Sequence, residues 1–247
     1  MRKIKFYSFA LSPFALKVQS YLLFLDVDFE TEFVDPMKAR SIIPVGTTIP
    51  VLTIDGESRN NSSDLGFWLD DLYPEKHLVP EQLKDKIVAA DNWVTRQLIN
   101  HAFRESVGFD DSMIAKFKKR WRLSKVLDLT SPNGISTIFR ILHMLFIEQS
   151  FIKGHINSTD KSRPLSELKL ELANQFESLL EGGPFLCGSN HPTLADLSAY
   201  PQIVKTEVVN GEDYFLPGQC VLDWVKNMEQ SVPNLLQCFP EVIKHTK

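Results

Sequence analysis

The segment Ser12-Pro13-Phe14-Ala15 stands where a strand-like run passes into a helix-like run. Redox-active proteins place a nucleophilic cysteine at such a junction, because the free amides and the dipole of the helix stabilise a thiolate there. This chain has Ser12 instead, and Ala15 occupies the place of a second thiol. A serine hydroxyl at this point can cap the helix or donate a hydrogen bond to a negatively charged ligand group.

The cysteines and histidines show no catalytic or metal-binding spacing of their own. The three cysteines are odd in number and lack C-x-x-C spacing, which argues against both a disulfide framework and a zinc site. A reducing compartment fits best, and we expect the cytoplasm. The six histidines are not paired at metal-ligand distances along the chain, so we expect no metal.

Composition and charge exclude several classes of protein. The 247 residues are 43% hydrophobic and 23% charged, which is typical of a globular protein of one or two domains. A net charge of -4 argues against nucleic-acid binding, and the basic run 116–122 is best interpreted as a solvated helix face. The start of the chain lacks the apolar core of a signal peptide. The apolar run 138–147 is too short to span a membrane, so we expect no membrane partner.

The first 75 residues change their hydrophobic period repeatedly. Residues 4–7 alternate like a half-buried strand, and Pro13 then opens a run with helical spacing. A second alternating run follows at 28–33, and residues 49–61 contain two strands around an Asp55-Gly56 hairpin signal. Residues 62–74 end the region as a short helix. This order predicts a small α/β layer whose last two strands are antiparallel.

From about residue 81 the pattern is helical throughout. We place a domain at residues 1–75, a linker at 76–82 and an all-helical domain at 83–247. Thr193-Leu-Ala-Asp196 predicts a capping box at the start of a late helix, with a structural role.

Four segments together resemble the glutathione transferase superfamily, of the serine and cysteine type. Ser12–Ala15 is similar to its active-site turn, and residues 44–52 are similar to its Pro-x-Gly-x-x-Pro-Val-Leu loop. Asn61–Asp64 stands where the family has an acidic residue followed by serine. Residues 184–201 are similar to its Phe-Leu-x-Gly and Thr-x-Ala-Asp segment. The resemblance implies a thioredoxin-like N-terminal domain followed by an all-α C-terminal domain. Residues 107–158 do not align with this pattern.

The resemblance implies that the protein activates the thiol of glutathione as a substrate. Ser12 would donate a hydrogen bond to the sulfur and favour its thiolate. Tyr7, on the first strand, is the alternative hydroxyl, because some transferases use a tyrosine there. Pro50 would be a cis proline that exposes the Ile49 backbone to the peptide-like ligand. The expected glutathione-binding residues are Phe14, Ile49, Pro50, Asn61, Ser62 and Ser63.

The second substrate implied by the resemblance is a small electrophile, taken in conjugation, dehalogenation or isomerisation during detoxification. In this family the first helix of the second domain, here with Asn92, Arg96 and Gln97, faces the pocket for that substrate. Family members usually form homodimers. A non-catalytic binding or scaffold protein of the same fold is the alternative, since Asn61 replaces the usual acidic residue. A reductase that uses Cys187 is a further alternative.

Overall fold

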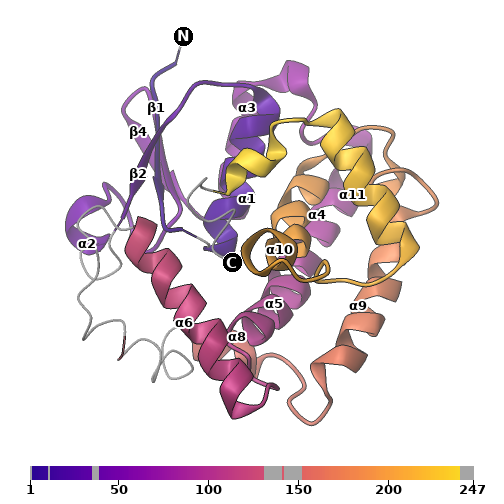
Figure 1. The fold of residues 1–247 in the computed structure, drawn as a ribbon. Helices are drawn as coiled ribbons and strands as arrows, with labels where there is room; N and C mark the ends of the chain where they lie inside the picture. Colours follow the sequence, from indigo (N-terminus) through magenta and orange to yellow (C-terminus); the bar gives the residue numbers. More distant parts are fainter. Residues whose placement is uncertain (1, 11, 35–38, 131–140, 142–151, 240–247) are drawn as a thin grey trace.

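The computed structural model describes residues 2–10, 12–34, 39–130, 141 and 152–239 (Figure 1). Most of the apolar run 138–147 therefore lies outside the described residues. The strands are β1 Ile4–Ser8, β2 Glu30–Phe33, β3 Val51–Ile54 and β4 Glu57–Asn60. The α-helices are α1 Pro13–Leu25, α2 Ala39–Ile42, α3 Ser62–Leu72, α4 Lys84–Trp93, α5 Ile99–Ser106, α6 Met113–Thr130, α8 Ile152–Asn157, α9 Leu165–Leu180, α10 Leu194–Asn210 and α11 Gln219–Ser231.

The four strands form one mixed sheet in the order β2-β1-β3-β4. β1 pairs with β2 in parallel, and both other pairs are antiparallel. The β3–β4 turn consists of Asp55 and Gly56, both at positive φ, so the predicted hairpin is confirmed. The expected α/β layer with an antiparallel final pair is therefore present.

Helices cover both faces of the sheet (Figure 1). The buried side chains Ile4, Phe6, Leu52 and Ile54 pack in one core with those of α1 and α3. On the opposite face, Val34, Ile43 and Val51 form a smaller cluster beside α2. The sheet thus separates a large core shared with the helical domain from a small local one.

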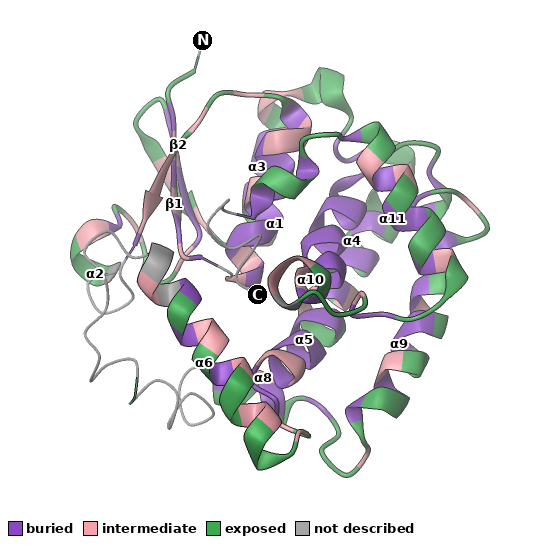
Figure 2. Ribbon diagram, viewed as in Figure 1, coloured by how far each residue is buried: buried purple, intermediate pink, exposed green. Residues whose placement is uncertain are grey.

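α10 is the central helix of the remaining chain, and nearly every residue of its first three turns is buried (Figure 2). It packs against α1 and α4 and so joins the two predicted domains. Gly66 of α3 lies so close to Leu194 and Tyr21 that a Cβ at this position would overlap the leucine side chain. The two domains therefore share one close-packed interior.

Short helical segments connect the larger helices. α4 passes directly into a π-helical turn, η3 Val94–Leu98, and then into α5. The 3-10 turns are η1 Pro74–Lys76, η2 Glu81–Leu83, η5 Leu186–Gly188 and η6 Leu235–Cys238. Among the described residues, no helix combines the length and apolar character needed to cross a membrane.

Candidate active site

Ser12 is the N-cap residue of α1. Its backbone is extended, and its Oγ accepts a hydrogen bond of 3.4 Å from the amide of Ala15. The capping role considered from the sequence is therefore confirmed. Because Oγ acts as the acceptor in this contact, its own hydrogen remains available for donation to another group.

The first turn of α1 leaves few backbone donors free. Pro13 has no N–H, and the Ala15 N–H is taken by Ser12. The Phe14 amide lies in the first turn and has no acceptor within the helix. Two donors, the Ser12 hydroxyl and the Phe14 amide, thus lie at the positive end of the helix dipole.

The sheet register brings the other predicted segments to the same edge. Tyr7 of β1 pairs with Val51 of β3, which pairs with Asn60 of β4. The Ile49–Pro50 bond immediately before β3 is cis, as predicted. Consequently the cis proline, the end of β1 that leads to Ser12 and the start of α3 after Asn60 lie together.

Asn61 holds the start of α3 in an uncommon backbone conformation, with φ 74° and ψ 110°. Its Oδ1 accepts a hydrogen bond of 3.2 Å from the Ser63 amide and so caps the helix. Ser62 follows as the first helical residue and is 6% exposed. The side-chain amide nitrogen of Asn61 stays available to a ligand, because the cap uses only the oxygen.

Ser63 uses both of its donors within the protein. Its hydroxyl donates to Asp91 Oδ2 over 2.6 Å, and its amide is taken by Asn61. Both donors of Ser63 are thus engaged within the protein, and its predicted glutathione contact stays a prediction, in which a ligand carboxylate would replace one of these partners.

A buried ion pair lies directly behind this edge. Lys17 Nζ of α1 is 2.7 Å from Asp91 Oδ1 of α4, and the two side chains are 0% and 4% exposed. Lys17 also donates to Thr95 on the π-helical turn over 3.0 Å. Burial lowers the pKa of Lys17, and the charge of Asp91 opposes that shift.

Further hydroxyls extend this ion pair into a network between the domains. Ser198 of α10 donates to Asp91 Oδ1 over 2.6 Å, and its hydroxyl also bonds that of Tyr21. We call Lys17, Ser63, Asp91 and Ser198 the interdomain network. No pattern in the sequence indicates this network. On the same helical stretch the predicted pocket-facing candidates, Asn92, Arg96 and Gln97, are exposed. Asp91 and Thr95 instead face α1.

Tyr7 lies on the other side of the sheet from the α1 core. Its ring joins the small cluster of Val34, Ile43 and Val51 beside α2, and the Lys5 ammonium lies 5.2 Å from the ring centroid. α1, which begins after Ser12, covers the opposite face. This arrangement favours Ser12 over Tyr7 as the hydroxyl near a ligand at the helix start.

Cys187 is not suited to thiol chemistry. It is 2% exposed, and burial raises the pKa of its thiol to about 12. A thiol with this pKa is almost entirely protonated at neutral pH, which argues against the reductase alternative. Within the described ranges, no group of three His, Cys, Asp or Glu side chains is arranged to hold a metal ion.

Comparison with known proteins identifies the fold. Residues 6–77 match the family model of the glutathione S-transferase N-terminal domain. The chain has the glutathione transferase fold. The predicted resemblance, with a thioredoxin-like domain before a helical one, is thus confirmed. A search of curated proteins by sequence finds no match.

Solved structures of a β-etherase and of glutathione transferases align with nearly the whole chain at low sequence identity. β-Etherase LigF from Sphingobium sp. strain SYK-6 is 17% identical, with a TM-score of 0.61 over 95% of this chain and 99% of that one. Human glutathione S-transferase T1-1 is 18% identical, with a TM-score of 0.61 over 97% of this chain and 89% of that one. A rice glutathione S-transferase solved in complex with glutathione is 14% identical, with a TM-score of 0.58 over 97% and 91%.

Proposed function

We propose that this protein is a glutathione transferase in which Ser12 activates the glutathione thiol for attack on a small electrophile. The observation that carries the proposal is the geometry at the start of α1. There the Ser12 hydroxyl caps the helix as an acceptor and keeps its hydrogen for a ligand. The cis proline and the start of α3 border the same edge.

The mechanism rests on stabilising the thiolate. The Ser12 hydroxyl and the Phe14 amide would each donate to the sulfur at the positive end of α1. A hydrogen bond to a charged group contributes about 1.5–3 kcal/mol, which corresponds to a thiol pKa lowered by about one to two units. The thiol proton leaves to solvent before the attack.

The thiolate then forms a carbon–sulfur bond with the electrophile. In conjugation by displacement or in dehalogenation, the leaving group departs with the electron pair of the broken bond. In isomerisation, the sulfur is released again and glutathione is regenerated. The orientation of the reacting atoms supplies much of the rate in each case.

The remainder of the tripeptide would lie along the edge formed by β3 and α3. The Ile49 backbone beside the cis Pro50 would pair with the peptide part, as an added strand does. The Ser62 hydroxyl and the start of α3 would receive a carboxylate, and the Asn61 amide would provide a further polar contact. We also propose a homodimer that acts in the cytoplasm on toxic electrophiles.

A non-catalytic binding or scaffold protein of the glutathione transferase fold is the second candidate. Two observations favour it: Asn61 carries no charge to pair with the amino group of the ligand, and Ser63 is occupied by Asp91. Both features would weaken the binding of glutathione, and neither affects the activation of its thiol.

Binding and turnover together distinguish the two candidates. We expect the protein to be retained on immobilised glutathione, and Ser12→Ala to lower turnover much more than it lowers glutathione affinity. Ser20→Ala is the matched control, because Ser20 lies in the same helix and its hydroxyl donates only to the Leu16 carbonyl among the described residues. Equal loss of affinity and turnover in Ser12→Ala would favour the scaffold. Flow-through without any thermal shift at millimolar glutathione would exclude the transferase and favour the non-catalytic candidate.

A further inference from the structure

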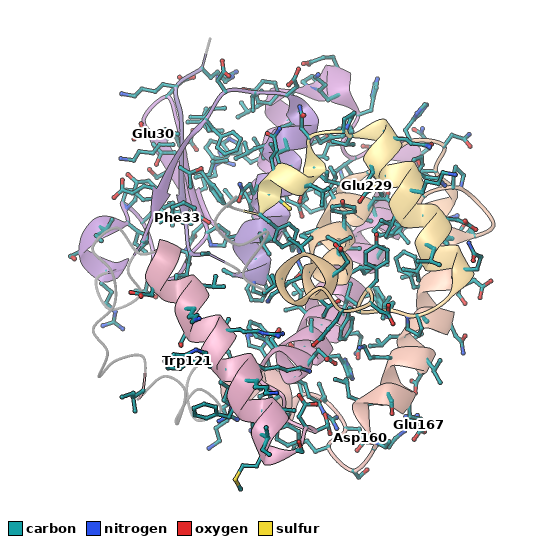
Figure 3. All side chains as sticks on the ribbon, viewed as in Figure 1. Glu30, Phe33, Trp121, Asp160, Glu167 and Glu229 are labelled. Carbon is teal, nitrogen blue, oxygen red and sulfur yellow. The ribbon has the colours of Figure 1, made fainter. Side chains whose placement is uncertain are left out.

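α8 belongs to the region that does not align with the family pattern, yet it is fixed firmly against α5. Arg104 of α5 is fully buried and donates to both carboxylate oxygens of Asp110. The same guanidinium donates to the backbone carbonyls of Asp160 and Arg163, each over 2.7 Å. Asp160 lies at the end of the helical layer, in the turn after α8 (Figure 3). A single side chain thus anchors the turn after α5 and the turn after α8.

Because α8 is anchored in this way, its residue His155 lies beside Phe14, in the first turn of α1 at the proposed thiol site. The centroid of the His155 ring is 5.8 Å from that of Phe14, with an interplanar angle of 43°. The His155 ring also stacks on Phe103 of α5, with a centroid distance of 4.7 Å and an interplanar angle of 27°. His155 therefore connects the start of α1 with the helical domain.

The hydrogen bonds around Asn100 determine which nitrogen of His155 carries the proton. Asn100 Nδ2 donates to the Arg96 carbonyl over 2.6 Å, so its Oδ1 is the end that faces His155. His155 Nδ1 is 2.7 Å from this oxygen, which can only accept. Nδ1 therefore bears the hydrogen, and in the neutral ring Nε2 carries the lone pair.

Burial keeps the imidazole neutral and thus able to accept. Desolvation lowers the pKa of His155, and among the described residues no carboxylate is bonded to it. The ring is only partly buried. Nδ1 is bonded to Asn100, and among the described residues no hydrogen bond is made by Nε2, so Nε2 is the ring nitrogen left to a ligand.

We propose that His155 binds the second substrate and selects electrophiles that carry a hydroxyl group, whose hydrogen is donated to Nε2. This inference rests on the proposed function, since it places the electrophile beside Phe14 and the thiol. Selectivity arises because an analogue without the hydroxyl leaves the acceptor without its partner.

Binding of a matched pair of probes to the full-length protein tests this assignment without turnover. 4-Chlorophenol carries a hydroxyl donor, and 4-chloroanisole is its methyl ether. We expect calorimetry to show that His155→Phe, which keeps the aromatic contacts, weakens 4-chlorophenol binding about 5- to 10-fold, the effect of one hydrogen bond. Its affinity for 4-chloroanisole should stay within about 2-fold.

Nitrogen NMR of wild-type protein with labelled histidine provides a readout that does not depend on the variant. We expect the Nδ1–H tautomer, and an Nε2 shift on addition of 4-chlorophenol but not of 4-chloroanisole. Equal weakening of both probes, an Nε2–H tautomer, or no saturable binding of either probe would overturn the proposal. If the probes and the NMR behave as expected but the wild-type protein does not bind glutathione, only the transferase assignment would be overturned.

Discussion

At Ser12 a single hydroxyl supports the helix and remains able to serve a ligand. The oxygen accepts the Ala15 amide, so a substitution that removes the hydroxyl affects both the cap and any bond to sulfur. These two effects have different sizes and can be separated by the choice of side chain. Loss of a cap costs about 1 kcal/mol, whereas loss of thiolate stabilisation changes the rate.

We predict that Ser12→Asp keeps the stability of the protein and loses its activity. Aspartate is a good N-cap residue, so the free energy of unfolding should stay within about 0.5 kcal/mol of wild type. Its negative charge would repel the thiolate and raise the thiol pKa, so turnover at neutral pH should fall by at least about 10-fold. Urea denaturation and initial rates measure the two effects. Substantial activity in this variant would show that position 12 does not approach the sulfur.

Residue chemistry explains which parts of the site could be predicted. Ser12, the cis Pro50 and Asn61 stand in short local patterns that specify a cap, a turn and a helix start. Lys17 could not be found in this way, because a lysine in a helix usually lies at the surface. Its burial depends on Asp91, which is distant in the sequence.

At the level of elements, the start of α10 depends on one carboxylate. Asp196 accepts from the Thr193 amide, and the Thr193 side chain accepts from the Asp196 amide, as the predicted capping box requires. The Thr193 hydroxyl also donates to the Asp196 carboxylate. It also accepts from the Leu186 amide and the Trp224 indole, two contacts that the sequence pattern did not indicate. The Asp196 carboxylate therefore joins η5, α10 and α11 in addition to capping the start of α10.

We predict that Asp196→Asn lowers the free energy of unfolding by about 3 kcal/mol at pH 7. The asparagine side chain would point an NH2 group at N–H and O–H groups that now donate to the carboxylate. Burial raises the pKa of Asp196 to about 6, so the folded protein retains a proton that the unfolded chain releases. The associated stabilisation is complete below about pH 4 and is lost as the pH rises through about 6.

The stability difference between wild type and Asp196→Asn should therefore narrow from pH 4 to pH 6, by roughly 1–3 kcal/mol. Denaturation curves across this range measure it. Asp223→Asn, at an exposed position of α11, is the control and should show little change. A stability difference between wild type and Asp196→Asn that widens with rising pH would contradict a raised pKa of Asp196.

At the scale of the whole molecule, the interdomain network connects the N-terminal α/β domain to the helical domain. Lys17 and Ser63 come from the N-terminal domain, and Asp91 and Ser198 come from the helical one. A buried ion pair adds little to the free energy of unfolding compared with an apolar contact of similar size, but removing one partner leaves an uncompensated buried charge. We therefore expect the largest loss of stability when only one of the two charges is removed.

We predict that Lys17→Met and Asp91→Asn each lower the free energy of unfolding by about 3–5 kcal/mol. The double variant should lose clearly less than the sum, because neither charge is then left alone. Lys86→Met removes an exposed pair with Glu181 between α4 and the end of α9, and it should cost less than about 1 kcal/mol. Additive losses in the double variant would show that the two charges are not coupled.

The overall architecture was predictable because strand periodicity, the hairpin and the capping box are local signals that agree with one another. The position of α8 was not, since it depends on contacts of Arg104 and His155 with residues far along the chain. Long-range contacts of this kind leave no periodic pattern in the sequence.

The most direct test of the account is the ionisation of bound glutathione. Ultraviolet absorbance reports the thiolate, so a pH titration of the complex gives the thiol pKa on the protein. We predict a value about one to two units below that of free glutathione for the wild type, and a return toward the free value in Ser12→Ala. An unshifted thiol pKa in the wild-type complex, or an equal shift in both proteins, would contradict the proposed role of Ser12.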